Sequence, residues 1–408
     1  MQFGLLGRKL GHSYSPQIHK CLADYPYRLF EVEPEDLHEF LKTTELTGFN
    51  VTIPYKKAVI SYCSHLSPQA ERIGAVNTIV RQPDGTYIGH NTDYFGFQYM
   101  VNASGLSLSG KKVLILGSGG ASATAVAVLQ DLGADTVVIS RSGENNYSNL
   151  HLHSDAAAIV NTTPVGMYPA VGVSPIDLEL FPNLEGVLDL IYNPGLTKLL
   201  LDSHKHRIVA MNGLLMLVAQ AKQSAEWFIG KAIPDTVIPK IHKILQDQTQ
   251  NIILIGMPGS GKTTVGKLLA DKLHRTFMDT DAEITKVAGF SIPEIFAKYT
   301  EDGFRKLETE VLAQLGMQSG LVIATGGGCV TRTENYNHLH QNGCIVWLQR
   351  SIDRLPTEGR PLSQSARLED MYAIRKPLYE AFSDITVENN SLPTIAVQEI
   401  LDKMGKEI

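Results

Sequence analysis

Cysteine is scarce in this sequence, and the cysteines that occur are far apart. The 408 residues contain four of them: Cys21, Cys63, Cys329 and Cys344. Their spacing matches no metal-ligand pattern and suggests a reducing compartment. This usage argues against a disulfide framework and a cysteine-based metal module. We therefore expect a cytoplasmic protein.

Long apolar runs and an excess of positive charge are also missing. Outside the Gly/Ala-rich segment 113–129, no stretch of about 18 residues is uncharged and strongly apolar. A buried strand, turn and helix explain that segment better than a membrane span. The opening MQFGLLGRKLGHS is too short and too interrupted by glycine for a secretory signal. The net charge of -6 offers no general attraction for nucleic acid or an anionic membrane.

Strand-like apolar runs alternate with helical patterns along the whole chain. The length predicts two or three domains of about 150 residues each. The runs KKVLILG, DTVVIS and AAIVNTTP precede a polar patch at residues 246–250, and NIILIG, LVIATGGG and CIVWLQ follow it. This alternation is typical of parallel α/β sheets. We expect two α/β units in tandem, with a boundary near Gln250.

GMPGSGKT, in the second half, satisfies the P-loop pattern at Gly256, Gly261, Lys262 and Thr263. A strand-like run precedes it and a helical run follows. Glycines let backbone N–H groups approach phosphates, and a helix N-terminus adds partial positive charge. The pattern therefore predicts nucleotide binding, with Lys262 at the β/γ-phosphates and Thr263 at Mg²⁺.

Charged residues beyond the P-loop indicate the kind of phosphoryl acceptor. Asp279 and Asp281 follow a short apolar run. One carboxylate can hold Mg²⁺ through water, and the other can accept a hydroxyl proton. Alone, such a pair is more typical of a solvated turn, and an isolated arginine is usually solvated as well. Several arginines beside a triple glycine, however, favour a small substrate held through a carboxylate. These arginines are Arg305, Arg360 and Arg375.

The order of these motifs from residue 251 to 408 resembles the shikimate kinase family. The resemblance implies that Asp281 binds and activates the shikimate hydroxyl, that Arg305 and Arg375 bind its carboxylate, and that Gly327 lets the backbone approach the ring. It assigns ATP to Gly259, Ser260, Gly261, Lys262, Thr263, Thr264 and the lid residue Arg360, and the metal to Thr263 and Asp279. The lid stretch QRSIDRLPTEG is shorter than usual in the family. Whether Arg354 replaces a second lid arginine is left open.

A second glycine-rich turn, at residues 117–122, follows the KKVLIL run in the first half. Ser122 stands where a strict dinucleotide pattern has its third glycine, so the turn alone is weak evidence. The next strand-like run ends at Ser140 and Arg141, where a NAD site usually has a carboxylate. Because arginine can pair with a 2′-phosphate, this position favours NADP. A solvated strand end is the alternative interpretation.

Three constellations lie upstream of that turn. GHSYSP contains Ser13 and Ser15, NVTIPYK ends with Lys56, and GAVNT and GHNTD contribute Asn77 and Asp93. Each alone is typical of a structural turn or strand end. A lysine and an aspartate that converge in a cleft would suit carbonyl reduction. The lysine can donate a proton, and the aspartate can hold the lysine in place and tune its pKa.

In order, these segments resemble the shikimate dehydrogenase family over residues 1 to about 245. The resemblance implies Lys56 and Asp93 as the catalytic pair. It assigns the substrate to Ser13, Ser15, Thr52, Asn77, Tyr192 and Gln220, and NADP to Gly117, Ser118, Gly119, Gly120, Ala121, Arg141 and Gly213. It also implies a substrate domain of residues 1–97 with a returning segment 211–245, a Rossmann-like domain of residues 98–210, a linker of residues 246–250 and the kinase domain of residues 251–408. The segment after Arg141 lacks the second basic residue that is usual in the family.

Together the halves predict a bifunctional enzyme that reduces 3-dehydroshikimate with NADPH and phosphorylates shikimate with ATP, in aromatic amino acid biosynthesis. Two alternatives remain. A non-catalytic regulator should have lost Lys56, Asp93, Lys262 or Asp281, and all four are present. A quinate/shikimate dehydrogenase that prefers NAD is disfavoured by Arg141. Small-molecule substrates are expected, without nucleic acid or membrane, and a monomer and a weak homodimer are equally open.

Overall fold

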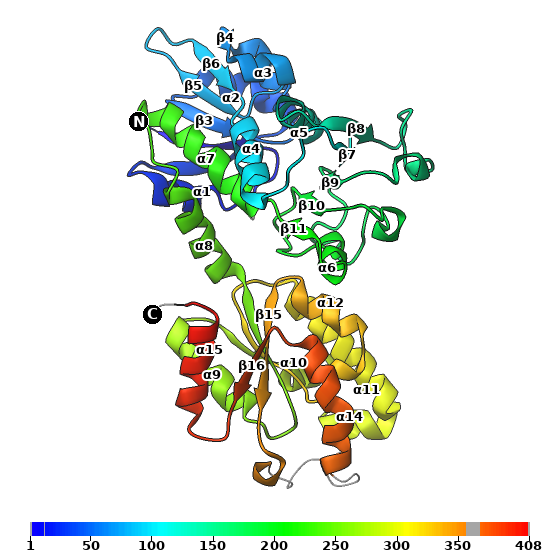
Figure 1. Cartoon of the computed structure of the whole chain (residues 1–408). Coiled ribbons are helices and arrows are strands. Elements are labelled where there is room, and N and C mark those ends of the chain that lie inside the picture. Colours follow the sequence, from blue (N-terminus) through cyan, green and yellow to red (C-terminus); the bar gives the residue numbers. More distant parts are fainter. Residues whose placement is uncertain (1, 12, 356–367, 407–408) are drawn as a thin grey trace. The chain divides into compact units, whose positions relative to one another are not determined.

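The structure is a computed structural model that describes residues 2–11, 13–355 and 368–406 (Figure 1). The chain forms two compact units. The first comprises Met1–Gly166, Val173–Tyr192 and Asp202–Ile244, and the second comprises Met167–Gly172, Asn193–Leu201 and Leu245–Ile408. The second unit therefore contains the whole region after the expected boundary, together with two short segments from before it.

The first sheet of the first unit has six strands in the order β2-β1-β3-β5-β6-β4. They are β1 (Phe3–Gly7), β2 (Tyr27–Glu31), β3 (Gly48–Val51), β4 (His65–Leu66), β5 (Thr78–Arg81) and β6 (Tyr87–His90). Strands β3 and β5, and also β5 and β6, pair antiparallel. The expectation of parallel sheets is therefore wrong for these two pairs, whereas β1 pairs parallel with β2 and β3, and β4 pairs parallel with β6. The five residues between β5 and β6 can form a hairpin but cannot hold a crossover helix.

The second sheet is parallel throughout, with the order β11-β10-β9-β7-β8. Its strands are β7 (Lys112–Leu116), β8 (Asp135–Ile139), β9 (Ala158–Asn161), β10 (Gly186–Asp189) and β11 (Val209–Met211). Strands β9 and β10 are buried along their whole length, and both read as short apolar runs. The sheet confirms the expected Rossmann-like fold of this region.

The helices of the first unit include one pair that packs unusually closely. The helices that belong wholly or partly to this unit are α1 (Ser15–Leu22), α2 (Leu37–Thr43), α3 (Pro68–Ile73), α4 (Asp93–Ser104), α5 (Gly120–Asp131), α6 (Lys198–Lys205), α7 (Leu214–Ile229) and α8 (Val237–Thr249). Residues 198–201 of α6 and 245–249 of α8 belong to the second unit. Helix α7 packs on α4 and α1. A Cβ atom on Gly96 of α4 would lie 2.7 Å from the carbonyl oxygen of Met216, so glycine permits this approach. The returning segment thus lies beside the first sheet.

Two expected boundaries coincide with helices. Residues 97 and 98 both lie inside α4, so no loop marks the limit between the two domains of the first unit. Helix α8 continues through Thr249, and β12 begins at Asn251. The expected linker at residues 246–250 is therefore mostly the last turn of a helix, which its glutamines readily join. The remaining domain limits stay a prediction.

The second unit is built on a parallel sheet with the order β13-β14-β12-β15-β16. Its strands are β12 (Asn251–Ile255), β13 (Phe277–Asp279), β14 (Val322–Ala324), β15 (Gly343–Gln349) and β16 (Ile385–Glu388). Ile253 and Ile255 of β12 belong to one apolar cluster, and Ile252 and Leu254 belong to another. This alternation buries both faces of the central strand, and the P-loop follows the end of that strand.

Helices cover both faces of this sheet (Figure 1). They are α9 (Lys262–Leu273), α10 (Thr280–Ala288), α11 (Ile292–Gly316), α12 (Glu334–His340), α14 (Leu368–Phe382) and α15 (Pro393–Lys403). Helix α11 is interrupted at Thr300, where φ is 63° and ψ is 179°. Short 3₁₀ turns occupy Pro34–Asp36, Ala58–Tyr62, Leu150–His153, Leu178–Leu180, Cys329–Thr331 and Ile352–Arg354.

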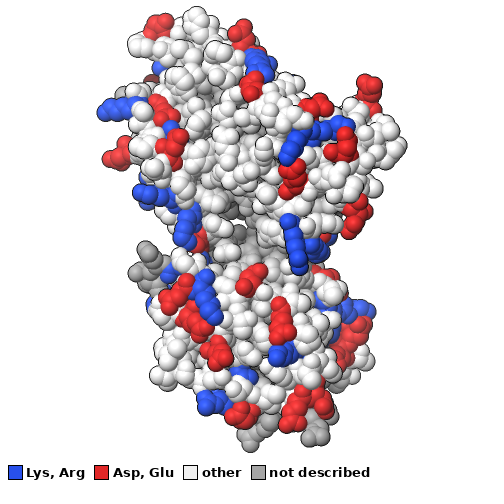
Figure 2. All heavy atoms as spheres, in the orientation of Figure 1, with Lys and Arg blue, Asp and Glu red and all other residues white. Residues whose placement is uncertain are grey.

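The charges on the surface and the lengths of the helices agree with the near-neutral composition and its short apolar runs. Acidic and basic side chains of the described residues intermingle on the face drawn in Figure 2. Within the described ranges, none of the helices combines the length and apolarity that a membrane crossing requires.

Candidate active sites

Lys56 and Asp93 form an ion pair in the first unit. The Nζ atom of Lys56 donates to Oδ2 of Asp93 over 2.7 Å, and the two side chains are 26% and 14% exposed. Asp93 is the first residue of α4, where the helix dipole favours a carboxylate. The predicted convergence is therefore present, and the partial exposure leaves the ammonium group within reach of a substrate.

Asn77 and Gln220 meet beside this pair. Oδ1 of Asn77 accepts from the backbone N–H of Thr92 at 2.7 Å, and Nδ2 of Asn77 donates to Oε1 of Gln220 at 3.4 Å. Thr92 directly precedes Asp93 in the chain. The three residues are less than 10% exposed, and their hydrogen bonds are formed with one another and with buried neighbours such as Ser224. The structure thus brings two predicted substrate residues next to the ion pair.

The other predicted substrate residues lie on three separate segments. The backbone N–H of Ser15 donates to Oγ of Ser13 at 3.2 Å, at the start of α1. Thr52 directly follows β3, and the ring of Tyr192 lies 5.6 Å from that of Tyr14. Burial raises the pKa of Tyr192. Among the described residues, no side-chain hydrogen bond joins Thr52 or Tyr192 to the ion pair, so their approach to it stays a prediction.

The glycine-rich turn after β7 has the geometry of a dinucleotide loop. Gly117 has a φ of 106°, and a Cβ atom there would lie 2.8 Å from Oγ1 of Thr162. Helix α5 begins at Gly120, so its first N–H groups face the loop. Ser118, Gly119 and Ser122 line an adjoining open cavity of about 360 Å³. Backbone donors at a helix N-terminus beside an open cavity suit a pyrophosphate.

Two further predicted cofactor residues have different surroundings. Arg141 is exposed just beyond the end of β8. Burial raises the pKa of Tyr147, and the nearby charge of Arg141 partly offsets this. Gly213 directly precedes α7, and a Cβ atom there would lie 2.1 Å from the carbonyl oxygen of Leu190. Backbone packing alone therefore requires glycine at residue 213.

The P-loop of the second unit holds three glycines at positive φ. The φ angles are 143° at Gly256, 86° at Gly259 and 95° at Gly261, values that other residues rarely adopt. Nζ of Lys262 donates to the carbonyl oxygens of Gly256 and Met257 at 2.8 and 2.9 Å. The loop thus has the curvature and the lysine that a phosphate cradle requires. Ser260 is fully buried within it, and Thr264 lies in the first turn of α9.

Thr263 and Asp279 offer a pair of oxygens beside the P-loop. Oγ1 of Thr263 donates to Oδ2 of Asp279 at 3.0 Å, and Oδ1 of Asp279 accepts from the backbone N–H of Asp281 at 3.1 Å. Within the described ranges, no group of three or more histidine, cysteine or acidic residues is arranged to hold a metal by itself. A hydroxyl and a carboxylate beside a phosphate site nevertheless fit Mg²⁺, which keeps water and phosphate ligands in such sites.

Glu308 is a site residue that sequence analysis missed. Oε2 of Glu308 accepts from Nη1 of Arg305 at 2.7 Å, and the carboxylate is completely buried. Oε1 has no hydrogen-bond partner among the described residues. Burial raises the pKa of Glu308, the charge of Arg305 opposes this shift, and the charge of Asp281 adds to it. Glu308 therefore holds the guanidinium group while one oxygen stays available.

The triple glycine forms a wall that these side chains approach. A Cβ atom on Gly326 would lie 2.4 Å from Oε1 of Glu308 and 3.2 Å from Oδ1 of Asp281. A Cβ atom on Gly328 would lie 2.1 Å from Nη2 of Arg305.

Gly327 belongs to the same wall. Its carbonyl oxygen accepts from Arg375 at 3.2 Å, and a Cβ atom there would lie 2.6 Å from Cδ of Pro258. The predicted acid, both described arginines and the glycines therefore converge beside the P-loop.

Comparison with known proteins decides what these two sites belong to. Residues 5–79 match the family model of the shikimate dehydrogenase substrate binding domain, and residues 258–405 match that of shikimate kinase. The shikimate dehydrogenase (NADP(+)) of Clostridium beijerinckii is 36% identical over 244 residues, which cover 55% of this chain and 90% of that protein. The chain belongs to the shikimate dehydrogenase family. It also carries a shikimate kinase domain, so it is a bifunctional enzyme of the shikimate pathway.

Solved structures agree with the dehydrogenase assignment. Shikimate dehydrogenase 1 of Peptoclostridium difficile is 37% identical with a TM-score of 0.56, and the match covers 60% of this chain and 97% of that one. The shikimate 5-dehydrogenase of Thermus thermophilus, solved in complex with NADP(H) and shikimate, is 29% identical with a TM-score of 0.55. That match covers 60% of this chain and 99% of that one.

Two further residues support the P-loop of the kinase domain without having been predicted. Nδ2 of Asn389, just after β16, donates to the carbonyl oxygen of Ser260 at 2.8 Å. Nη1 of Arg350, just after β15, donates weakly to that of Gly259 at 3.4 Å. From the sequence, only their positions after strand-like runs could have indicated that these two residues lie near the P-loop. Arg354 donates to the carbonyl oxygen of Asn390, and Arg360 lies outside the described residues.

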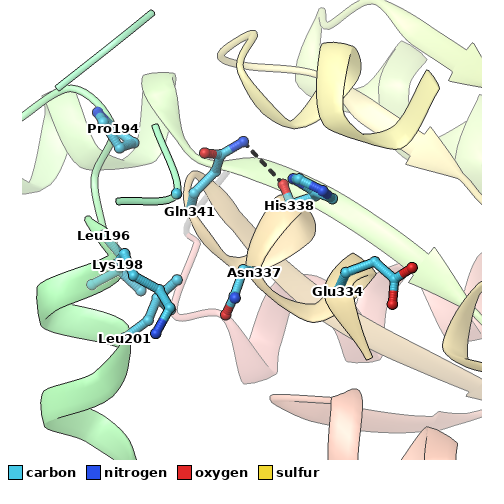
Figure 3. A pocket seen from close by; sticks show the side chains of 9 residues that line it. Pro194, Leu196, Lys198, Leu201, Glu334, Asn337, His338 and Gln341 are labelled. Atoms are coloured by element: carbon cyan, nitrogen blue, oxygen red, sulfur yellow. Dashed lines mark hydrogen bonds between the residues drawn. The ribbon is translucent and has the colours of Figure 1, made fainter. Parts of the chain in front are cut away.

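A small cavity in the second unit is separate from the predicted sites. Its volume is about 120 Å³, and Figure 3 shows most of its lining side chains. Gln341, one of them, donates to the carbonyl oxygen of His338 at 3.2 Å. None of the lining residues is among those predicted to bind nucleotide or substrate.

Proposed function

We propose that Lys56 is the proton donor when the shikimate dehydrogenase reduces 3-dehydroshikimate. The observation that carries this proposal is its 2.7 Å contact with Asp93. NADPH, when bound, supplies the hydride to the carbonyl carbon. Lys56 then gives its proton to the carbonyl oxygen, so the ketone becomes an alcohol. Asp93 holds the ammonium group in place, and the buried amides of Asn77 and Gln220 bind substrate hydroxyls.

The cofactor of the dehydrogenase is proposed to be NADP(H). Arg141 stands at the end of β8, where the 2′-phosphate of an adenosine ribose would lie. A guanidinium group pairs well with a phosphate, whereas a ribose diol would call for a carboxylate. The loop of residues 117–121 offers its N–H groups to the pyrophosphate. The bound NADP(H) of the Thermus relative supports this choice.

In the kinase domain, Asp281 is proposed to accept the proton of the shikimate hydroxyl. Arg305, held by Glu308, and Arg375 would bind the carboxylate of shikimate, because both lie at the glycine wall. Lys262 would then turn to the β/γ-phosphates of ATP. Thr263 and Asp279 would hold Mg²⁺, which supplies neutralising charge to the phosphates when bound.

Assays on the purified full chain test this proposal. We expect shikimate with NADP to produce the absorbance of reduced nicotinamide, and shikimate with Mg-ATP to release ADP. Removal of divalent metal by a chelator should stop the second reaction and leave the first unchanged, because hydride transfer needs no metal. Equal rates with NAD and NADP would refute the cofactor assignment. Binding of shikimate without turnover in either assay would instead support a non-catalytic regulator.

A further inference from the structure

The hydroxyl of Ser224 sits at the centre of a buried polar cluster in the dehydrogenase. Ser224 is completely buried on α7. Its Oγ atom lies 2.8 Å from Nδ2 of Asn50, 2.8 Å from Oγ1 of Thr78 and 2.9 Å from Oγ1 of Thr92. It also donates to the backbone carbonyl of Gln220 at 3.0 Å. One hydrogen and two lone pairs can serve three of these four partners at a time, so the hydroxyl has no hydrogen-bonding capacity to spare.

These partners come from segments that are distant in the sequence. Ser224 follows Asn50 by 174 residues, Thr78 by 146 and Thr92 by 132. Asn50 lies on β3, Thr78 begins β5, and Thr92 precedes the α4 residue Asp93. The cluster therefore fastens α7 to the first sheet and to the start of α4 at one point.

Gln220 lies one helical turn before Ser224. Its side chain is 9% exposed, and its Oε1 atom lies 3.4 Å from both Nδ2 of Asn77 and Oγ1 of Thr92. These two contacts are long, whereas Nε2 of Gln220 donates to the carbonyl oxygen of Leu217 at 2.9 Å, so the amide is held mainly by its own helix. The shorter contacts of Ser224 determine instead where this turn of α7 lies relative to Thr92.

We propose that Ser224 is a positioning residue of the dehydrogenase, which sets the amide of Gln220 toward the substrate by fixing its turn of α7. The inference rests on the assignment of Gln220 to the substrate made above. It predicts that loss of the hydroxyl affects substrate binding through Gln220. General damage to the fold would instead change all kinetic constants.

A double-mutant cycle on the full chain tests this coupling. Ser224→Ala should raise the KM for shikimate about tenfold, the effect of one or two lost hydrogen bonds. The KM for NADP and the kinase activity should stay within about twofold. In a Gln220→Ala background, the same substitution should raise the KM for shikimate by less than about twofold. Ser203→Ala, at an equally buried serine on α6, is the matched control and should change neither KM.

Each outcome of the cycle either supports or overturns the inference. An unchanged KM in Ser224→Ala, or equal increases in both backgrounds, would overturn the inference while the site assignment stands. A Gln220→Ala enzyme with a normal KM for shikimate would overturn the assignment of Gln220 and the inference with it. If Ser224→Ala does not fold, Thr78→Val removes the hydroxyl that faces Ser224 from β5. The same non-additive result with Gln220→Ala is then expected, and additive effects would overturn the inference.

Discussion

The Nζ atom of Lys56 lies 2.7 Å from Oδ2 of Asp93, although 37 positions separate the two residues in the chain. Lys56 follows β3 in the middle of the first sheet, and Asp93 begins α4, which follows the last strand of that sheet along the chain. The pair therefore depends on the packing of the whole substrate domain and on no local motif.

Replacing Lys56 by methionine should reduce the turnover of the dehydrogenase. The side chain keeps most of its length but loses the proton, so kcat should fall at least ~10²-fold with a smaller change in the KM for shikimate. Steady-state oxidation of shikimate with NADP measures both. Lys57→Met, at the exposed neighbouring lysine, is the control and should be nearly normal. A rise in KM with an unchanged kcat would mean that Lys56 binds the substrate but does not donate the proton.

Replacing Arg141 by aspartate should shift the cofactor preference toward NAD. The substitution removes the partner of the 2′-phosphate and introduces a carboxylate that repels it and can bond a ribose diol. The ratio of kcat/KM for NADP and NAD measures the shift. Arg207→Asp reverses another exposed charge of the first unit and should leave the ratio unchanged. An unaltered ratio in Arg141→Asp would assign the 2′-phosphate to another group.

Replacing Lys262 by alanine should abolish the kinase reaction alone. The β/γ-phosphates of ATP lose their main charge partner. Oxidation of shikimate with NADP should remain within about twofold, as expected for independent sites. Both assays are run on one preparation, with Lys267→Ala, an exposed lysine of the same helix, as control. A severe loss of dehydrogenase turnover in a folded protein would instead mean that the two activities are coupled.

Replacing Thr300 by glycine should stabilise the kinase domain. A φ of 63° with a ψ of 179° is strained for threonine and accessible to glycine. Relief of strain exceeds the added entropy of the unfolded chain by about 1 kcal/mol. Urea unfolding followed by Trp347 fluorescence, in a Trp227→Phe background, measures the difference. Thr285→Gly, inside α10, should destabilise the domain, because glycine is unfavourable in a helix interior. A destabilised Thr300→Gly would show that the strain is absent in solution.

Acid should destabilise the dehydrogenase through His19. Burial lowers the pKa of this histidine from 6.5 to about 3 in the folded protein. Between these values the unfolded chain binds a proton that the folded chain does not, so stability is lost as the pH falls below 6.5. One such group contributes a slope of about 1.4 kcal/mol per pH unit.

Urea unfolding of a Trp347→Phe enzyme at several pH values, followed by Trp227 fluorescence, measures that slope. His19→Gln should be less stable at neutral pH but should show a flatter pH dependence. If the free energy of unfolding depended on pH equally in the two proteins, groups other than His19 would cause the loss of stability in acid.

The features that were predictable from the sequence are those fixed by local geometry. The P-loop was predictable because three glycines at positive φ, a lysine and a following helix leave their pattern in eight consecutive residues. Glu308 closes the GFRKLE run, but no role could be predicted for it, because a glutamate inside a helix has no local mark of being buried. Its importance arises only where Gly326 and Arg305 approach it.

The errors have a similar physical origin. The polar patch at residues 246–250 suggested a linker, but glutamine is a good helix former, and α8 continues through four of these five residues. The antiparallel pairing of β5 and β6 depends on a hairpin of five residues, whereas alternating apolar runs suggested a parallel sheet. Ser224 gave no signal at all, because its three distant partners become visible only after folding.

The glycine wall at residues 326–328 also restricts how this sequence can evolve. A methyl group at residue 326 would collide with Glu308, one at 327 with Pro258 and one at 328 with Arg305. Each codon is therefore constrained by a different neighbour, and no single compensating change elsewhere could free all three. A side chain at residue 326 or 328 could be accommodated only if Glu308 or Arg305 of the site moved, whereas a substitution on an exposed helix displaces no site residue.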